Sequence, residues 1–202
     1  MSVLPILAVI GGRGMAVDME ELTRRASGGT GLGTWLGQEK QALQDTLEIE
    51  NVNSDIQVAG ALFGPKIRAV PLERTLRGWS VKKRCLFWAR YHARIRKQQS
   101  LESLLTRLLT YNERDKLYST YYRPWVESNG RVHSLYSLGK AATGRLASSR
   151  TNLMNVPDIA RELIIPSPGY SLICQGDFRS FELGGAAHVS RDPVMIDWIT
   201  RG

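Results

Sequence analysis

The chain has 202 residues, of which 43% are apolar, and this is enough to bury a core in one domain or two small ones, so wholesale disorder is not expected. Its 27 Lys and Arg against 19 Asp and Glu give a formal net charge of +8, which fits a phosphate-binding surface and an ordinary basic soluble domain equally well. Two cysteines, Cys85 and Cys174, exclude a disulfide framework and a cysteine-based metal site, as is typical of a reducing cytosol.

The first half of the chain is predicted to be mainly helical. The apolar run 3–10 contains Pro5 and is too short to span a bilayer, so we expect it to lie in the core rather than act as a signal peptide or membrane segment. Asp18 is placed to cap a helix within residues 15–25, because it precedes two glutamates that favour the helix dipole. Further helices are expected over residues 38–47, 53–63, 79–97 and 100–109, and Asn53-Ser54-Asp55 can cap the second of these.

Basic residues are concentrated between Lys66 and Lys97, where Glu73 is the only acid. A stretch with so one-sided a charge repels itself unless an anion faces it. Within it, the predicted helix 79–97 also carries Trp79 and three further aromatic residues. Two interpretations stay open: the helix grips a nucleic-acid backbone, or its aromatic residues pack inward and its charges are only solvated.

After Asn129-Gly130 the sequence changes to short β-prone runs separated by Pro and Gly. These runs are residues 131–138, 162–165 and 170–177. A helix is expected over residues 181–190, and Asp192-Pro193 fits the start of another. We therefore expect a helical region over residues 1–128 and a strand-rich region over residues 129–202.

Two segments carry residues suited to phosphate chemistry. The apolar run 171–176 ends at Asp177, and Mg²⁺ prefers one or two carboxylates together with substrate phosphates. Residues 143–149 form a Gly-containing polar run with one cation, Arg145, which suits contact with phosphates or base edges. Each pattern is weak by itself, because an Asp after a strand is more often a turn residue.

Taken in order, the motifs of the second half are far more specific. They are GRVHS at 130–134, ATGRLASS at 142–149, NLMNVP at 152–157, DFRSFEL at 177–183 and AHVSRD at 187–192. This series resembles the signature of the family A DNA polymerases, which reads GRVHT, TATGRLSS, PNLQNIP, DYSQIELR and AHLSRD at similar separations. The resemblance is specific from Gly130 to Asp192 and looser upstream.

The resemblance implies an α+β fold, with a helical thumb followed by the first strands and helix of a polymerase palm. It implies nucleotidyl transfer from a dNTP to a primer 3'-hydroxyl, with two Mg²⁺ ions as cofactors. Asp177 and the backbone carbonyl of Phe178 match metal ligands of the family. Glu182 matches the glutamate beside the sugar of the incoming nucleotide.

The resemblance also implies contacts with primer-template DNA. Arg145 matches an arginine that touches the primer terminus through the minor groove, and Asn152 and Asn155 match residues near the DNA backbone. In the basic helix, the expected DNA-binding residues are Lys82, Lys83, Arg90 and Arg94. Arg179, Ser180 and Met154 depart from the family pattern and indicate a divergent, phage-like or relaxed polymerase.

The motifs of the family's fingers and its second metal-binding aspartate do not occur in this sequence. We therefore expect the isolated chain to be inactive, with a C-terminal polymerase half as a possible partner. The alternative is a truncated module that binds duplex DNA without catalysis. A cytoplasmic location in a bacterium or a phage-infected cell is expected, with no membrane partner.

Overall fold

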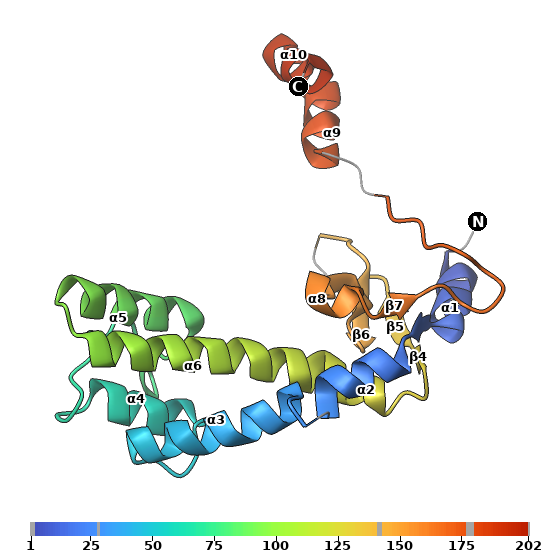
Figure 1. Cartoon of the computed structure of the whole chain (residues 1–202). Helices are drawn as coiled ribbons and strands as arrows, with labels where there is room; N and C mark the ends of the chain where they lie inside the picture. Colours follow the sequence, from blue (N-terminus) through green and yellow to red (C-terminus); the bar gives the residue numbers. More distant parts are fainter. Residues whose placement is uncertain (1–2, 28, 141–142, 177–179, 202) are drawn as a thin grey trace. The chain divides into compact units, whose positions relative to one another are not determined.

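The computed structural model describes residues 3–27, 29–140, 143–176 and 180–201, and it has an α+β fold (Figure 1). The chain divides into two compact units, Met1–Ser167 and Pro168–Gly202. The expected boundary near residue 128 separates regions of different secondary structure. However, it falls inside the first unit, because strands from both sides of it pair in one sheet.

The apolar run at the N-terminus forms helix α1 (Leu4–Arg13), and the expectation that it lies in the core is wrong. None of its residues is buried, and Leu4 and Val9 are both more than half exposed. One side of α1 rests on strand β5 (Ser134–Ser137), where a side chain on Gly11 would meet the backbone oxygen of Ser134. This one-sided packing leaves the other apolar faces of the helix in solvent.

Strand β1 (Met15–Val17) and helix α2 (Met19–Ser27) replace the single helix expected over residues 15–25. The Asp18 carboxylate accepts a 2.9 Å hydrogen bond from the Glu21 backbone N–H, so the predicted cap is confirmed. Glu21 binds Arg24 and Arg25 of the same helix, and Arg25 reaches Glu162 at 3.2 Å. The Arg24 and Arg25 hydrogen bonds lower the pKa of Glu21 to about 2.

One core lies among four helices: α3 (Leu32–Leu47), α4 (Asp55–Phe63), α5 (Lys83–Ile95) and α6 (Gln99–Leu117). Leu43, Leu62 and Leu105 are fully buried in it. Ser54 caps α4 as predicted. Helix α5 begins four residues later than expected, because Trp79 belongs to a small hairpin of strands β2 (Arg74–Thr75) and β3 (Gly78–Trp79).

Helix α6 continues without a break into a π-helical turn, η1 (Tyr118–Tyr122), and then into α7 (Arg123–Val126). A second core surrounds the fully buried Trp125 and joins these turns to α2 and to the start of the strands. Its members include Leu22, Val132 and Leu163. The second core thus connects the helices with the strand-rich segment.

The strands form short antiparallel pairs. Strand β1 lies between β4 (Arg131–Val132) and β7 (Ile164–Ile165), and β5 pairs with β6 (Ala147–Arg150). After β6, the chain makes a 3-10 turn, η2 (Leu153–Asn155), and a short helix, α8 (Asp158–Arg161). The predictions of strands within residues 131–138 and 162–165 are confirmed.

In the second unit, the predicted strand over residues 170–177 is wrong for its described part, 170–176, which has no regular structure. A strand needs a hydrogen-bonded neighbour, and no described segment pairs with these residues. Helices α9 (Phe181–Ser190) and α10 (Pro193–Arg201) agree with the prediction. The Asp192 carboxylate accepts hydrogen bonds from the Val194 and Met195 backbone N–H groups and so caps α10.

Candidate nucleic-acid interface

The β5–β6 hairpin carries the motif that contains Arg145. Its two strands pair in register from Ser134 opposite Arg150 to Ser137 opposite Ala147. Arg145 lies in the loop that leads into β6, and its side chain is exposed. Arg145 therefore lies two residues before a strand that is paired along its whole length.

Asn152 and Asn155 follow the hairpin directly, and hydrogen bonds hold both in place. The Ser148 hydroxyl of β6 donates to the Asn152 side-chain oxygen at 2.7 Å. The Tyr121 hydroxyl of η1 donates to the Asn155 backbone carbonyl at 2.6 Å, which leaves the exposed Asn155 side chain outside this contact. Asn152 is thus tied to β6, and Asn155 to the end of the long helix.

The cations expected to bind DNA lie at the start and along the length of α5, but they differ in their partners. Lys83 pairs with Glu113 of α6 at 2.6 Å. Lys82, at the N-terminal end of the helix, and Arg94, near its other end, form no ion pair among the described residues, although the charge of Lys82 acts on Glu73. Because an ion pair neutralises part of the field of a cation, Lys82 and Arg94 offer more charge to a phosphate than Lys83 does.

The aromatic residues of α5 are also exposed. Phe87 and Trp88 are each 38% exposed and Tyr91 is 57% exposed, so the interpretation in which these rings pack inward is wrong. Arg90 lies over the Phe87 ring, with its guanidinium carbon 4.7 Å from the ring centre. The outer face of α5 therefore combines aromatic rings with cations.

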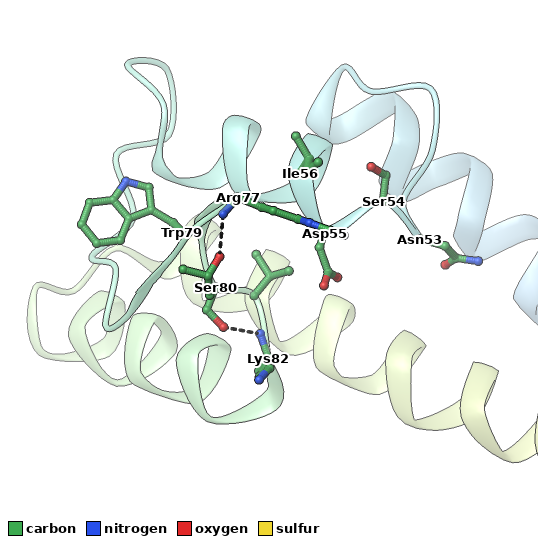
Figure 2. Close-up of a pocket in the computed structure, with 10 residues that line it drawn as sticks. Asn53, Ser54, Asp55, Ile56, Arg77, Trp79, Ser80 and Lys82 are labelled. Atoms are coloured by element: carbon green, nitrogen blue, oxygen red, sulfur yellow. Dashed lines mark hydrogen bonds between the residues drawn. The ribbon is translucent and has the colours of Figure 1, made fainter.

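A hollow of about 330 Å³ lies beside the start of α5, between the β2–β3 hairpin and the first turn of α4. Figure 2 shows Arg77 of the hairpin turn extending across it toward Asp55, with Lys82 on another side. Because Asp55 and these cations share the hollow, it presents charges of both signs. It is therefore a less suitable phosphate site than the open face of α5. This hairpin was not predicted from the sequence, although Gly78, directly after the two central residues of the turn, is favoured at that position.

The two groups of candidate residues lie at different places along α6, within the first unit. Helix α5 packs along α6. The Asn155 segment, which is the turn η2, contacts η1, and η1 extends α6 at its C-terminal end. Figure 1 shows α6 running from the neighbourhood of α5 to that of the strands. With 19 residues, α6 is about 28 Å long, close to eight phosphate steps of one strand of duplex DNA.

Glu182 lies in the first turn of α9, in the second unit, where a carboxylate favours the helix dipole. Asp177 and Phe178 lie outside the described residues. In the described ranges, no three His, Cys, Asp or Glu side chains come together in a group that could hold a metal ion. The same ranges contain no helix long and apolar enough to cross a membrane.

Comparisons with known proteins point to one family. The model of DNA polymerase family A matches residues 31–202. The DNA polymerase I of Geobacillus stearothermophilus is 27% identical over 98% of this chain, and that of Rhizobium leguminosarum is 31% identical over 95%. These matches cover 22% and 19% of the relatives, so the chain spans about a fifth of their length.

One solved structure with a similar fold is the POL domain of Pol1 from M. smegmatis, in complex with DNA primer-template and dNTP. It superposes with a TM-score of 0.76 over 95% of this chain and 33% of its own, at 23% sequence identity.

Proposed function

Because the chain belongs to the DNA polymerase A family, we propose that it forms the thumb and the first part of the palm of a template-directed DNA polymerase. In this proposal residues 1–128 are thumb-like and residues 129–202 begin the palm. Together these two regions bind primer-template DNA while a dNTP is joined to the primer 3'-hydroxyl. The observation that carries the proposal is the ordered set of family motifs from Gly130 to Asp192, within the matched residues 31–202.

The proposed roles follow the motifs residue by residue. Arg145, Asn152 and Asn155 contact the primer and template, which is consistent with their exposed or half-exposed positions around β6 and η2. Glu182 contacts the sugar of the incoming nucleotide. Asp177 and the Phe178 carbonyl hold Mg²⁺, which supplies charge stabilisation for phosphoryl chemistry when it is bound.

The cations of α5 add a contact with the duplex backbone. Lys82, Arg90 and Arg94 are spread along more than three turns of helix. Contacts with phosphates position a protein on DNA without reading its sequence. The proposed footprint therefore extends from α5 along α6 to the Asn155 segment.

Duplex binding by the 202-residue chain tests the first half of the proposal. Fluorescence anisotropy of a blunt duplex at several salt concentrations should give a log–log slope of about 0.9 per neutralised phosphate. The combined change of Lys82, Arg90 and Arg94 to Gln should flatten this slope by about 2 to 3 and weaken all duplex sequences alike. A matched variant with Lys40, Arg123 and Arg201 changed to Gln loses the same charge elsewhere and should keep most of the slope. Equal slopes for both variants would contradict the assigned interface.

Catalysis is tested in a chimera in which residues 31–202 replace the aligned part of the Geobacillus stearothermophilus relative. Primer extension by this chimera should disappear with Asp177→Asn while duplex affinity is retained. Glu182→Ala should increase incorporation of ribonucleotides relative to deoxyribonucleotides, because it opens space beside C2'. An extending chimera that tolerates Asp177→Asn would refute the metal assignment.

A further inference from the structure

The outer face of α5 has an unusual composition for a helix in solvent. The residues that α5 buries are small or aliphatic: Cys85, Leu86, Ala89 and Ala93. At about 100° per residue, these four fall within an arc of about 100°. Phe87, Trp88 and Tyr91 fall within a second arc of similar width on the opposite side. Burying an aromatic ring removes more apolar surface from water than burying alanine does, yet the sequence places these three rings on the outside of the helix.

The three rings are ordered by their neighbours. The Phe87 ring has the Lys83 ammonium 5.7 Å and the Arg90 guanidinium 4.7 Å from its centre. The Trp88 and Tyr91 ring centres are 6.3 Å apart and tilted by 32°. Trp88 also meets His92 edge-on, with centres 4.4 Å apart. The rings are thus supported from within the helix, and Tyr91 is the most exposed of them.

Charge on this face favours an anionic ligand. Glu113 and Glu73 compensate Lys83 and Arg84, and hydrogen bonding to Arg84 holds the pKa of Glu73 below its usual range. In the described part of the chain, no acid pairs with Arg90 or Arg94, which both lie on one side of Tyr91 around the helix. A ligand that suits both features has repeated negative charges and flat faces that can stack.

We propose that the outer face of α5 binds single-stranded nucleic acid, with unpaired bases stacking on Trp88 and Tyr91 and phosphates meeting Arg90 and Arg94. Aromatic platforms beside cations bind single strands in this way, because every base has a face that can stack. A duplex keeps its bases stacked inside and offers this face only phosphates. The inference rests on the proposed nucleic-acid binding of α5 but requires no polymerase activity.

The test compares two probes with the same phosphates. One is an oligothymidylate of about twelve nucleotides, within the usual site sizes, and the other is an abasic strand of equal length. The 202-residue chain should bind the oligothymidylate at least about fivefold more tightly. Tyr91→Ala should remove this preference and leave the affinity for a blunt duplex within about twofold. Tyr91→Phe retains the ring and should retain the preference.

Controls separate stacking from charge. Arg94→Gln should lower the salt slope for the single strand by about 0.7, whereas Tyr91→Ala should lower affinity without changing that slope. Tyr170→Ala removes an exposed ring outside α5 and should change nothing. Circular dichroism of each variant checks its fold.

The outcomes distinguish this inference from the proposed function. If duplex binding depends on Lys82, Arg90 and Arg94 but wild type does not prefer the oligothymidylate, the single-strand site is refuted and the duplex interface stands. If the chain binds neither the oligothymidylate nor the blunt duplex, both proposals fail. If Tyr91→Ala instead abolishes binding to vesicles of equal phosphatidylserine and phosphatidylcholine, with no effect on the oligothymidylate, the face is a membrane contact and the inference is overturned.

Discussion

The Tyr121 hydroxyl donates a 2.6 Å hydrogen bond to the backbone carbonyl of Asn155, across 34 residues of sequence. Tyr121 is buried in the second core, and its ring meets Trp125 edge-on at 5.8 Å. A tyrosine hydroxyl is protonated at neutral pH, and burial raises the pKa of Tyr121 further, so the hydroxyl can donate. The contact couples the end of the long helix to a proposed DNA-contact residue.

Tyr121→Phe should therefore destabilise the chain and loosen the Asn155 turn. Loss of one hydrogen bond costs about 0.5–1.5 kcal/mol in the free energy of unfolding, measured by urea denaturation followed by circular dichroism. Tyr91→Phe, at an exposed tyrosine, is the matched control and should leave the midpoint unchanged. Equal midpoints for both variants would show that the Tyr121 contact contributes nothing to stability.

Gly14 is required by both its conformation and its surroundings. Its φ is +61°, and an added Cβ would lie 2.5 Å from the Val132 backbone oxygen and 2.8 Å from the His133 Nδ1 atom. Gly14→Ala should cost about 1–3 kcal/mol from backbone strain alone, seen as a lower urea midpoint. Gly12→Ala, two residues earlier in α1, meets nothing within 4 Å and should be neutral or stabilise by about 0.5–1 kcal/mol. A Gly14→Ala chain as stable as wild type would mean that β4 does not approach Gly14 as described.

The ion-pair cluster around Glu21 predicts a specific acid sensitivity. Hydrogen bonds from Arg24 and Arg25 lower the pKa of Glu21 to about 2 in the folded chain, from an ordinary value of 4.5. A lowered folded-state pKa gives stability that is complete above about pH 4.5 and is lost as the pH falls toward 2. The thermal midpoint of wild type should fall more steeply across this window than that of Glu21→Gln. Parallel curves for the two chains would contradict the assigned pKa shift.

Local signals in the sequence predicted local structure well. Asp18, Ser54 and Asp192 each cap the helix that was expected to follow, because a cap needs only the side chain and the next turn. The strands within residues 131–138 also agree with expectation, whereas their partner β6, in the polar run of the ATGRLASS motif, was not predicted.

Predictions that depend on distant partners were less successful. The run 3–10 is apolar enough for a core, but burial depends on which elements pack against it, and β5 is the one element in the described ranges that packs closely on α1. Residues 170–176 have strand composition without a described pairing partner. At the candidate site, residue types could be predicted from the motifs. The partner of Lys83 could not, because Glu113 lies 30 residues away on another helix.

A pair of leucines distinguishes the core from the surface. Leu105 is fully buried among the four helices of the first core, whereas Leu76 is fully exposed at the tip of the β2–β3 hairpin. Leu105→Ala should cost about 2–5 kcal/mol through lost burial and a cavity. Leu76→Ala should change the free energy of unfolding by less than about 0.5 kcal/mol. Urea denaturation of the two variants measures both, and similar costs would show that the helices do not pack as described.

The last prediction concerns the Lys83–Glu113 ion pair, whose atoms lie 2.6 Å apart on the surface between α5 and α6. While Glu113 neutralises part of the Lys83 charge, Lys83 contributes less to phosphate binding than Lys82, which forms no ion pair with any residue that the structure describes. Lys82→Gln should therefore flatten the salt dependence of duplex affinity by about 0.9, and Lys83→Gln by clearly less. Glu113→Gln releases Lys83 and should tighten duplex binding, most strongly at low salt because salt screens exposed charges.

Glu127→Gln is the matched control for this prediction, because it makes the same change in net charge. Glu127 pairs with Arg123 in α7, away from α5. If Glu127→Gln tightens duplex binding as much as Glu113→Gln does, the effect reports the total charge of the chain and not the local pair. If Glu113→Gln alone tightens binding, and if Lys83→Gln then costs as much affinity as Lys82→Gln in that background, the ion pair sets how strongly α5 holds the phosphate backbone.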